Sequence, residues 1–300
     1  SDQLQRASLG LRRQPERRWT MIATATATVM PAAKEKHSTM PTHISPTAAK
    51  SYLGCSLRFY FERVACIPKP TSPALHLGKA VHAALQSFHL ARWRGGDDSA
   101  EAVAQAYEEA LVRLEKEEGP ANYEDDAKRE KSHADGLRIL AAYLDSPEAM
   151  KEKPRGVEVM LTEKIEGLSV PLTGVVDLVR QNLTPVDFKS AASRSDPQQA
   201  LFDHELQLVS YQLLLEEVTG ETPPALDLVF LVKTKTPQVV KVSSPPADRK
   251  RKNRVIRMLD TAVEGIAEER FHPQPGMQCS WCQFRKDCSK WPASVVDTTA

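Results

Sequence analysis

Two predicted strands near the middle of the chain bring acidic side chains and a lysine together. The first contains Gly174-Val-Val-Asp177, and the second contains Val186-Asp187-Phe188-Lys189. Residues i and i+2 of a strand project from the same face, so Asp187 and Lys189 point together while Phe188 turns into the core. A hairpin through residues 181–185 would bring Asp177 alongside. Two carboxylates beside an ammonium group can hold a hard divalent cation and a water next to a phosphodiester, so the pattern indicates phosphodiester hydrolysis.

The segments around these strands show clear periodicity. Apolar spacing of i, i+3 and i+4 predicts helices over residues 46–67 (after the N-cap Ser45), 77–93, 100–118, 125–144, 198–218 and 248–269. Alternation predicts strands over residues 157–165, 169–179, 184–188, 226–232 and 238–242. The first three strands are expected to form an antiparallel meander. This order of elements indicates one α/β domain over residues 46–290.

The two ends of the chain lack this periodicity. We expect a disordered leader over residues 1–45 and a disordered tail over residues 291–300. Residues 11–33 place arginines before an alternating Ala/Thr stretch, which is less apolar than an export signal requires; Met21 and Met40 are alternative initiation sites. No apolar run approaches the length that crosses a bilayer. We therefore expect a cytoplasmic protein without a membrane partner.

The cysteines are distributed unevenly along the chain. There are five, an odd number that argues against a secreted disulfide framework. Cys279, Cys282 and Cys288 form a C-x2-C-x5-C pattern near the end, whereas Cys55 and Cys66 lie far upstream. Three thiolates at this spacing with one distant partner can hold either Zn²⁺ or a [4Fe–4S] cluster. A zinc site more often uses two C-x2-C pairs.

These motifs occur in the order of a known family. The pair G-V-V-D and V-D-F-K resembles the core of the PD-(D/E)xK nuclease superfamily, in particular its RecB-like exonuclease branch. Gly78-Lys-Ala-Val-His82 resembles the upstream G-x-x-V-H motif of that branch, and Gln207-Leu-Val-Ser-Tyr211 resembles its downstream Q-x-x-x-Y motif. The cysteine set resembles the iron–sulfur segment of AddB nuclease domains and CRISPR-associated RecB-like exonucleases. The resemblance covers about residues 46–290.

The resemblance implies a fold and a metal site. The fold would be α/β, with a restriction-endonuclease-like core in which helices flank a mixed central sheet. A helical region would precede this core, and a cysteine-ligated tail would follow it. Asp177, Asp187, His82 and the backbone carbonyl of Phe188 would hold Mg²⁺ or Mn²⁺. A nitrogen ligand such as His82 favours Mn²⁺ somewhat.

The resemblance also implies roles for the remaining motif residues. Lys189 would orient or help deprotonate the attacking water and stabilise charge on the phosphate. Gln207 and Tyr211 share a helix face; Gln207 would contact the scissile strand or metal-bound water, and Tyr211 would support Lys189 or a phosphate. The alternatives are a surface ion pair between Asp187 and Lys189 and an ordinary amphipathic helix.

The resemblance favours an iron–sulfur cluster over zinc. Cys55, Cys279, Cys282 and Cys288 would hold a [4Fe–4S] cluster that clips the C-terminal tail to the first helix, with structural Zn²⁺ as the alternative. Cys66 would be spare.

The net charge of +1 supplies no global field for nucleic acid, so attraction must come from local patches. The run Arg249, Lys250, Arg251 and Lys252 is one such patch; it would either follow a nucleic-acid backbone or form a solvated helix face.

The sequence as a whole predicts a metal-dependent DNA exonuclease that acts on single strands or duplex ends, in DNA repair, recombination or CRISPR adaptation. The alternative is an accessory DNA-binding subunit of a helicase–nuclease assembly on the same fold. The chain has no G-x4-G-K-[ST] motif, so unwinding would require a partner helicase; CRISPR adaptation proteins are the other expected partners.

Overall fold

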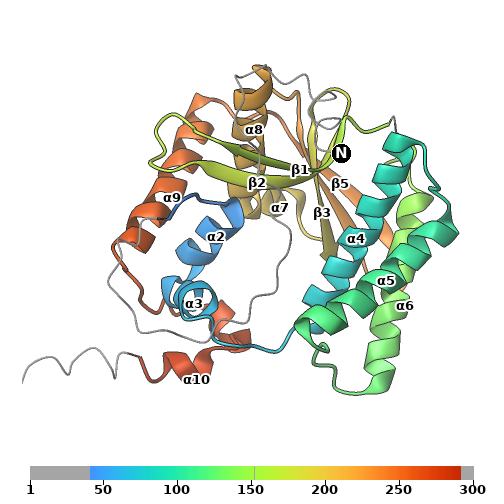
Figure 1. The fold of residues 1–300 in the computed structure, drawn as a ribbon, viewed down its shortest axis with the longest axis horizontal. Coiled ribbons are helices and arrows are strands. Elements are labelled where there is room, and N and C mark those ends of the chain that lie inside the picture. The colour runs from blue at the N-terminus through green and yellow to red at the C-terminus, as the bar shows by residue number, and fades with distance from the viewer. Residues whose placement is uncertain (1–40, 152, 292–300) are drawn as a thin grey trace, which may run out of the picture.

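A five-stranded mixed sheet forms the centre of the molecule (Figure 1). The computed structural model describes residues 41–151 and 153–291. The strands lie in chain order: β1 (Gly156–Glu163), β2 (Leu172–Val179), β3 (Pro185–Ala191), β4 (Leu226–Val232) and β5 (Gln238–Ser244). Only β3 and β4 pair in parallel; the other neighbours are antiparallel. The predicted meander is therefore confirmed, and the parallel pair makes the sheet mixed.

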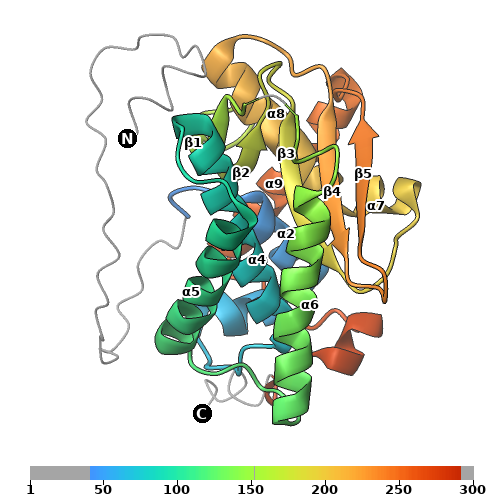
Figure 2. The same cartoon turned by 90° about the vertical axis from the view of Figure 1, so that its right-hand side faces the viewer.

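Helices cover both faces of this sheet (Figures 1 and 2). One face packs against α4 (Pro73–Arg94), α5 (Ala100–Glu118) and α6 (Asp126–Leu144), and the other against α2 (Pro46–Gly54), α8 (Glu205–Thr219) and α9 (Arg249–Ala267). Each face has its own apolar core. The shorter elements are α3 (Ser56–Phe59), η1 (Tyr60–Val64), α7 (Pro197–Asp203), η2 (Met277–Trp281) and α10 (Arg285–Cys288).

The helix predicted from residue 46 to residue 67 is wrong as one element. It ends at Gly54, because Cys55 adopts an extended conformation (φ −168°, ψ 105°). The freed N–H groups then bond to a distant segment: Ser56 N–H donates to Gln274 Oε1 (2.8 Å) and Leu57 N–H to His272 O (3.1 Å). The C-terminal segment thus replaces the intrahelical partners that would have continued the helix.

Two other predicted helices also differ clearly from the structure. The helix expected over residues 198–218 is divided at His204 into α7 and α8. The helix expected from residue 77 begins four residues earlier, because Ser72 Oγ accepts a hydrogen bond from Leu75 N–H and Pro73 occupies the first turn.

The domain begins upstream of residue 46. Ile44 falls in the segment expected to be a disordered leader, but it is buried and forms a parallel bridge with Leu172. Its N–H donates to Pro171 O (2.9 Å), and its carbonyl accepts from Thr173 N–H (2.8 Å). The disorder expected for residues 1–40 and 292–300 lies outside the described residues.

None of the helices in the described part of the chain combines the length and apolar character that crossing a bilayer requires.

Candidate active site

The candidate site lies where β2 and β3 separate. These strands pair only at Leu178↔Val186 and Val179↔Pro185. Beyond that point the side chain of Asp177 takes the place of the next backbone partner: its Oδ2 accepts a hydrogen bond from Phe188 N–H (2.8 Å). We call this separation of β2 and β3 the fork; it leaves space between two strands that each pair with another strand of the sheet.

The second acidic residue, Asp187, and the lysine, Lys189, lie on β3 beside this hydrogen bond. Asp187 is only 1% exposed, and its Oδ2 lies 2.7 Å from Lys189 Nζ. The contact is an ion pair without aligned hydrogen-bond geometry. Phe188, between them, turns to the opposite face and packs against the rings of His89 and Tyr143. Alternation along β3 therefore places Asp187 and Lys189 together, as the sequence predicted.

One turn of α8 fastens this pair. Gln207 Nε2 donates to Asp187 Oδ1 (2.7 Å) and lies 2.7 Å from Tyr211 Oη, while Gln207 Oε1 accepts from Lys189 Nζ (3.2 Å). Tyr211 Oη lies 3.5 Å from Asp187 Oδ1. Burial raises the pKa of Tyr211, so its phenol stays protonated. The structure thus brings together Asp187, Lys189, Gln207 and Tyr211, and Gln207 rather than Tyr211 contacts the lysine.

Glycine allows α8 to approach the sheet closely. A Cβ on Gly174 would lie 3.0 Å from Leu214 Cδ1 and 3.4 Å from Tyr211 Cε1. Such contacts are tight for a packed interior, so a larger residue would push α8 away from β2.

The helix α4 contributes the histidine. His82 Nδ1 lies 3.5 Å from Asp177 Oδ2. The close approach of α4 to β3 is again made by a glycine, since a Cβ on Gly78 would lie 3.3 Å from Ser190 Oγ. His82 therefore joins the site on the Asp177 side.

Glu158 is a site residue that our reading of the sequence missed. In the β1–β2 register it falls opposite Asp177, between the pairs Val157↔Leu178 and Val159↔Val176. Its φ of +50° is uncommon for a residue other than glycine. Burial, and then the negative charge of Asp177, raise the pKa of Glu158 to about 7. Counting the hairpin back from Asp177 would have located it.

A cavity of about 590 Å³ lies between α4 and the sheet; His82, Glu158, Asp177 and Lys189 border it, whereas Asp187, Gln207 and Tyr211 do not. It is lined by Ala74, Leu75, Gly78, Lys79, His82, Ala83, Gln86, Glu158, Val175, Asp177, Lys189 and Ser190. Burial, and then the negative charge of Asp187, raise the pKa of Asp177 because both disfavour its ionised form. A divalent cation suits such a place, and carboxylate oxygens are the ligands that Mg²⁺ prefers. Within residues 41–151 and 153–291, however, no three His, Cys, Asp or Glu side chains already lie close enough to hold a metal ion.

Comparison with protein-family models gives a match over residues 43–289 to the PD-(D/E)XK nuclease superfamily. The chain belongs to this superfamily. No curated protein matches it.

Two solved structures are similar to this PD-(D/E)XK nuclease. One, from Eubacterium rectale, is described as a "Putative exonuclease"; it is 14% identical, with a TM-score of 0.57, and the match covers 83% of this chain and 87% of that one. At this identity the likeness shows the fold, which is the restriction-endonuclease-like fold that the sequence predicted. The other, SSO0001, is 16% identical over 86% of this chain and 88% of that one, with a TM-score of 0.41.

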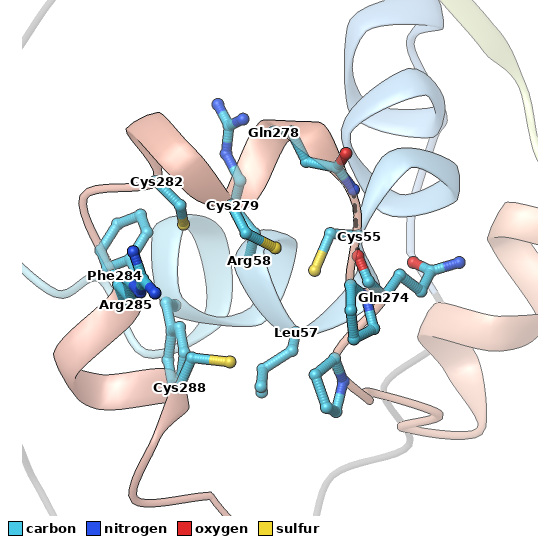
Figure 3. Close-up of a pocket in the computed structure, with 13 residues that line it drawn as sticks. Cys55, Leu57, Arg58, Gln274, Gln278, Cys279, Cys282, Phe284, Arg285 and Cys288 are labelled. Carbon is cyan, nitrogen blue, oxygen red and sulfur yellow. Dashed lines mark hydrogen bonds between the residues drawn. The ribbon is translucent and has the colours of Figure 1, made fainter.

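The nuclease also has a cysteine-lined pocket away from the cleft. Cys55, Cys279, Cys282 and Cys288 border a cavity of about 70 Å³, with their sulfur atoms directed toward a shared space (Figure 3). Burial and the three other thiols raise the pKa of Cys288. The apolar side chains Leu57, Phe61 and Phe284 pack beside it. Cys66 is exposed and lies outside this group, as predicted.

The basic run at the start of α9 divides into two halves. Arg251 pairs with Glu205 (2.9 Å), and Lys252 pairs with Glu216 (2.6 Å). Arg249 and Lys250 are exposed. Arg251 and Lys252 therefore already contribute to the packing of α9 against α8, while Arg249 and Lys250 face solvent.

Proposed function

We propose that this nuclease is a metal-dependent DNA exonuclease that acts on single strands or duplex ends. The observation that carries the proposal is the position of Lys189, whose ammonium group is held by Asp187 and Gln207 at the edge of a cavity that also contains Asp177. The exonucleolytic mode agrees with the description of the Eubacterium rectale structure as a "Putative exonuclease".

The residues of the fork divide the chemistry among them. Asp177, Asp187, His82 and the carbonyl of Phe188 would hold Mg²⁺ or Mn²⁺, which supplies Lewis-acid activation of water and of the phosphate. Lys189 stays on the cavity side of Asp187 and stabilises negative charge developing on the phosphate oxygens.

The remaining residues keep Lys189 in place. Gln207 uses its amide oxygen to orient the ammonium group and its amide nitrogen to orient the Asp187 carboxylate. Tyr211 fixes the amide of Gln207 from the next turn of α8.

The test uses DNA labelled at the 5′ or the 3′ end, single-stranded and duplex, with RNA of the same sequence, in Mg²⁺ and in Mn²⁺. We expect Asp187→Ala and Lys189→Ala to lower the cleavage rate by about 10²–10⁴-fold, the scale of a lost catalytic group. Lys128→Ala, at an exposed position on α6, is the control for loss of a surface charge. Full cleavage by both active-site variants would overturn the proposal. Binding of DNA by the wild type without cleavage under every condition would instead identify an accessory DNA-binding subunit.

We further propose that Cys55, Cys279, Cys282 and Cys288 hold a [4Fe–4S] cluster, with Zn²⁺ as the alternative. A cluster binds each thiolate at a different iron, so its ligands surround a volume, whereas a zinc ion draws four sulfurs to one point. Four thiols around a small cavity suit the cluster better. Iron, sulfide and zinc analysis of anaerobically purified protein separates the two, together with a broad absorbance near ~400 nm that only the cluster gives.

The proposed setting is the cytoplasm, with a helicase or CRISPR adaptation proteins as partners. The 300 residues contain no G-x4-G-K-[ST] motif, so ATP-driven unwinding of a duplex would come from outside them.

A further inference from the structure

Directly beside the carboxylates, the open face of the β1–β2 hairpin is apolar. Met160 and Val175 are cross-strand partners, two residues along their strands from Glu158 and Asp177. Glu158, Val175 and Asp177 line one cavity, and Met160 is the exposed cross-strand partner of Val175, so these four residues form one strip. Met160 is 71% exposed and Val175 is 36% exposed. An apolar pair in this position has no role in holding a cation.

The strip becomes polar again at the next pair. Thr162 and Thr173 face each other, with their Oγ1 atoms 2.9 Å apart. A step of two residues along a strand is about 7 Å, so the apolar section is one such step long. That length is comparable to the reach from a phosphate to the base of the same nucleotide.

The helix α4 forms the facing wall of the same cavity. Leu75, Lys79 and His82 are spaced four and three residues apart, so they lie on one face of the helix, and all three line the cavity. Leu75 is 47% exposed. His82 is beside Asp177, whereas Leu75 lies near the helix start; Val175 borders the same cavity from β2. Each wall therefore carries an apolar lining residue, Val175 on β2 and Leu75 on α4, in addition to the charged residues at the fork.

This arrangement matches one nucleotide of a single strand. A cavity of about 590 Å³ is within the range of small-ligand sites. Exposed apolar groups beside a charged site mark a binding surface. Aromatic side chains hold the bases of single strands without regard to sequence, and apolar side chains also contact the faces of an extruded base. The faces of a base inside a duplex are covered by its neighbours, so only an unpaired base offers an open face to such walls.

We propose that Met160, Val175 and Leu75 bind the base of an unpaired nucleotide whose phosphate lies at Asp177, so that the site selects single-stranded ends over blunt duplex ends. The proposal rests on the function proposed above and adds the substrate class to it.

The test compares wild type with Met160→Ser and with Leu75→Ser/Met160→Ser. Both side chains are exposed, so neither change removes a core contact, and Val112→Ser, at a 68% exposed position on α5, is the matched control. The substrates are a single-stranded oligonucleotide, a blunt duplex of the same sequence, and the single strand with abasic sites at its terminal nucleotides. Binding is measured separately, by fluorescence anisotropy without divalent metal.

We expect kcat/KM and affinity on the intact single strand to fall at least about fivefold in Met160→Ser, the scale of one lost base contact. They should not change in Val112→Ser. The abasic strand should be a poor substrate for wild type and no poorer for the variant, because both changes remove the same contact. This inference would be overturned if wild type cleaved the single strand and the blunt duplex with equal kcat/KM, or if Met160→Ser kept the kcat/KM and affinity of wild type. Neither result would contradict the proposed nuclease activity. Absence of any cleavage by wild type would overturn the proposed function, and the binding data would still decide whether the apolar walls hold a base.

Discussion

Asp177 Oδ2 and the backbone N–H of Phe188 form a 2.8 Å hydrogen bond across the point where β2 and β3 separate. This bond links the two acidic motifs through the backbone, because Phe188 lies between Asp187 and Lys189. The Asp177 side chain occupies the position of a ladder partner, so the strands can part without leaving Phe188 N–H unsatisfied. The position of one proposed catalytic group, Asp177, thus depends on a hydrogen bond to the strand that bears the proposed groups Asp187 and Lys189.

Asp177→Asn separates the structural and the chemical roles of this residue. The amide oxygen can still accept from Phe188 N–H, and the loss of charge relieves repulsion from Asp187, so metal-free protein should melt at an unchanged or higher temperature. Cleavage should fall by about 10²-fold or more, since a carboxylate in the site is lost. Thermal unfolding in EDTA and cleavage rates in Mg²⁺ check both expectations; a large loss of stability would contradict the first.

Cys282→Ser should release the C-terminal tail. Without one thiolate of the proposed cluster, iron content and absorbance near ~400 nm should fall. The free energy of unfolding should drop by about 2–4 kcal/mol, the scale of a cross-link that closes a long loop. Cys66→Ser is the control, because Cys66 is exposed and does not border the pocket. Equal behaviour of the two variants would rule out a ligand role for Cys282.

Arg249→Ala/Lys250→Ala tests the basic run at the start of α9. If both side chains contact phosphates, affinity for single-stranded DNA should fall, and the slope of log K against log salt should become shallower by about 0.7 per contact. Lys116→Ala/Lys128→Ala, at exposed positions on α5 and α6, is the control with the same charge change. An unchanged salt slope would assign the run to a solvated helix face.

His89 should make the protein less stable in acid. It is 4% exposed, its Nε2 lies 2.8 Å from Tyr143 Oη, and burial, with Arg92 and Arg180, lowers its pKa to about 3. In the unfolded chain the same histidine takes up a proton near its ordinary pKa of about 6.5. Between these two values the unfolded state binds the extra proton, so the free energy of unfolding should fall by up to about 1.4 kcal/mol per unit as pH decreases.

Denaturant unfolding from pH 7 to pH 4 checks this expectation. His89→Gln can keep a hydrogen bond to Tyr143 and does not titrate, so its stability should depend less on pH. A variant with the same pH slope as wild type would show that other groups cause the acid sensitivity.

Gly265→Ala should be strongly destabilising. A Cβ at this position in α9 would lie 1.9 Å from Tyr52 Oη on α2, and Tyr52 donates to Arg270 O (2.8 Å). Overpacking of this kind costs about 1–3 kcal/mol. Gly54→Ala is the matched control, because no atom lies within 4 Å of the added Cβ. Thermal unfolding of both variants tests the prediction, and equal melting temperatures would contradict it.

Much of the fold followed from local sequence signals. Alternation predicted all five strands, and apolar spacing predicted α4, α5, α6 and α9 within a few residues. These signals work because side chains close in sequence decide which backbone conformation buries apolar surface. The hairpin between Asp177 and Asp187 followed from the same argument, since its two strands are joined by a short turn.

Two of the errors occur where distant segments compete with local preference. The break at Cys55 depends on Gln274 and His272, which take the N–H groups of Ser56 and Leu57. Ile44 is ordered because Pro171 and Thr173 supply its backbone partners.

By itself the sequence determined which chemical groups meet on β2 and β3, because strand alternation and a short hairpin need only neighbouring residues. Only the tertiary structure decided how those groups are held. The pairing register of β1 with β2 places Glu158 beside Asp177. Gln207 on α8 hydrogen-bonds to both Asp187 and Lys189 and so connects them. The four cysteines border one pocket because the first helix ends before Cys55 and the C-terminal segment packs against that break. These features depend on packing between segments far apart in sequence, which periodicity does not encode.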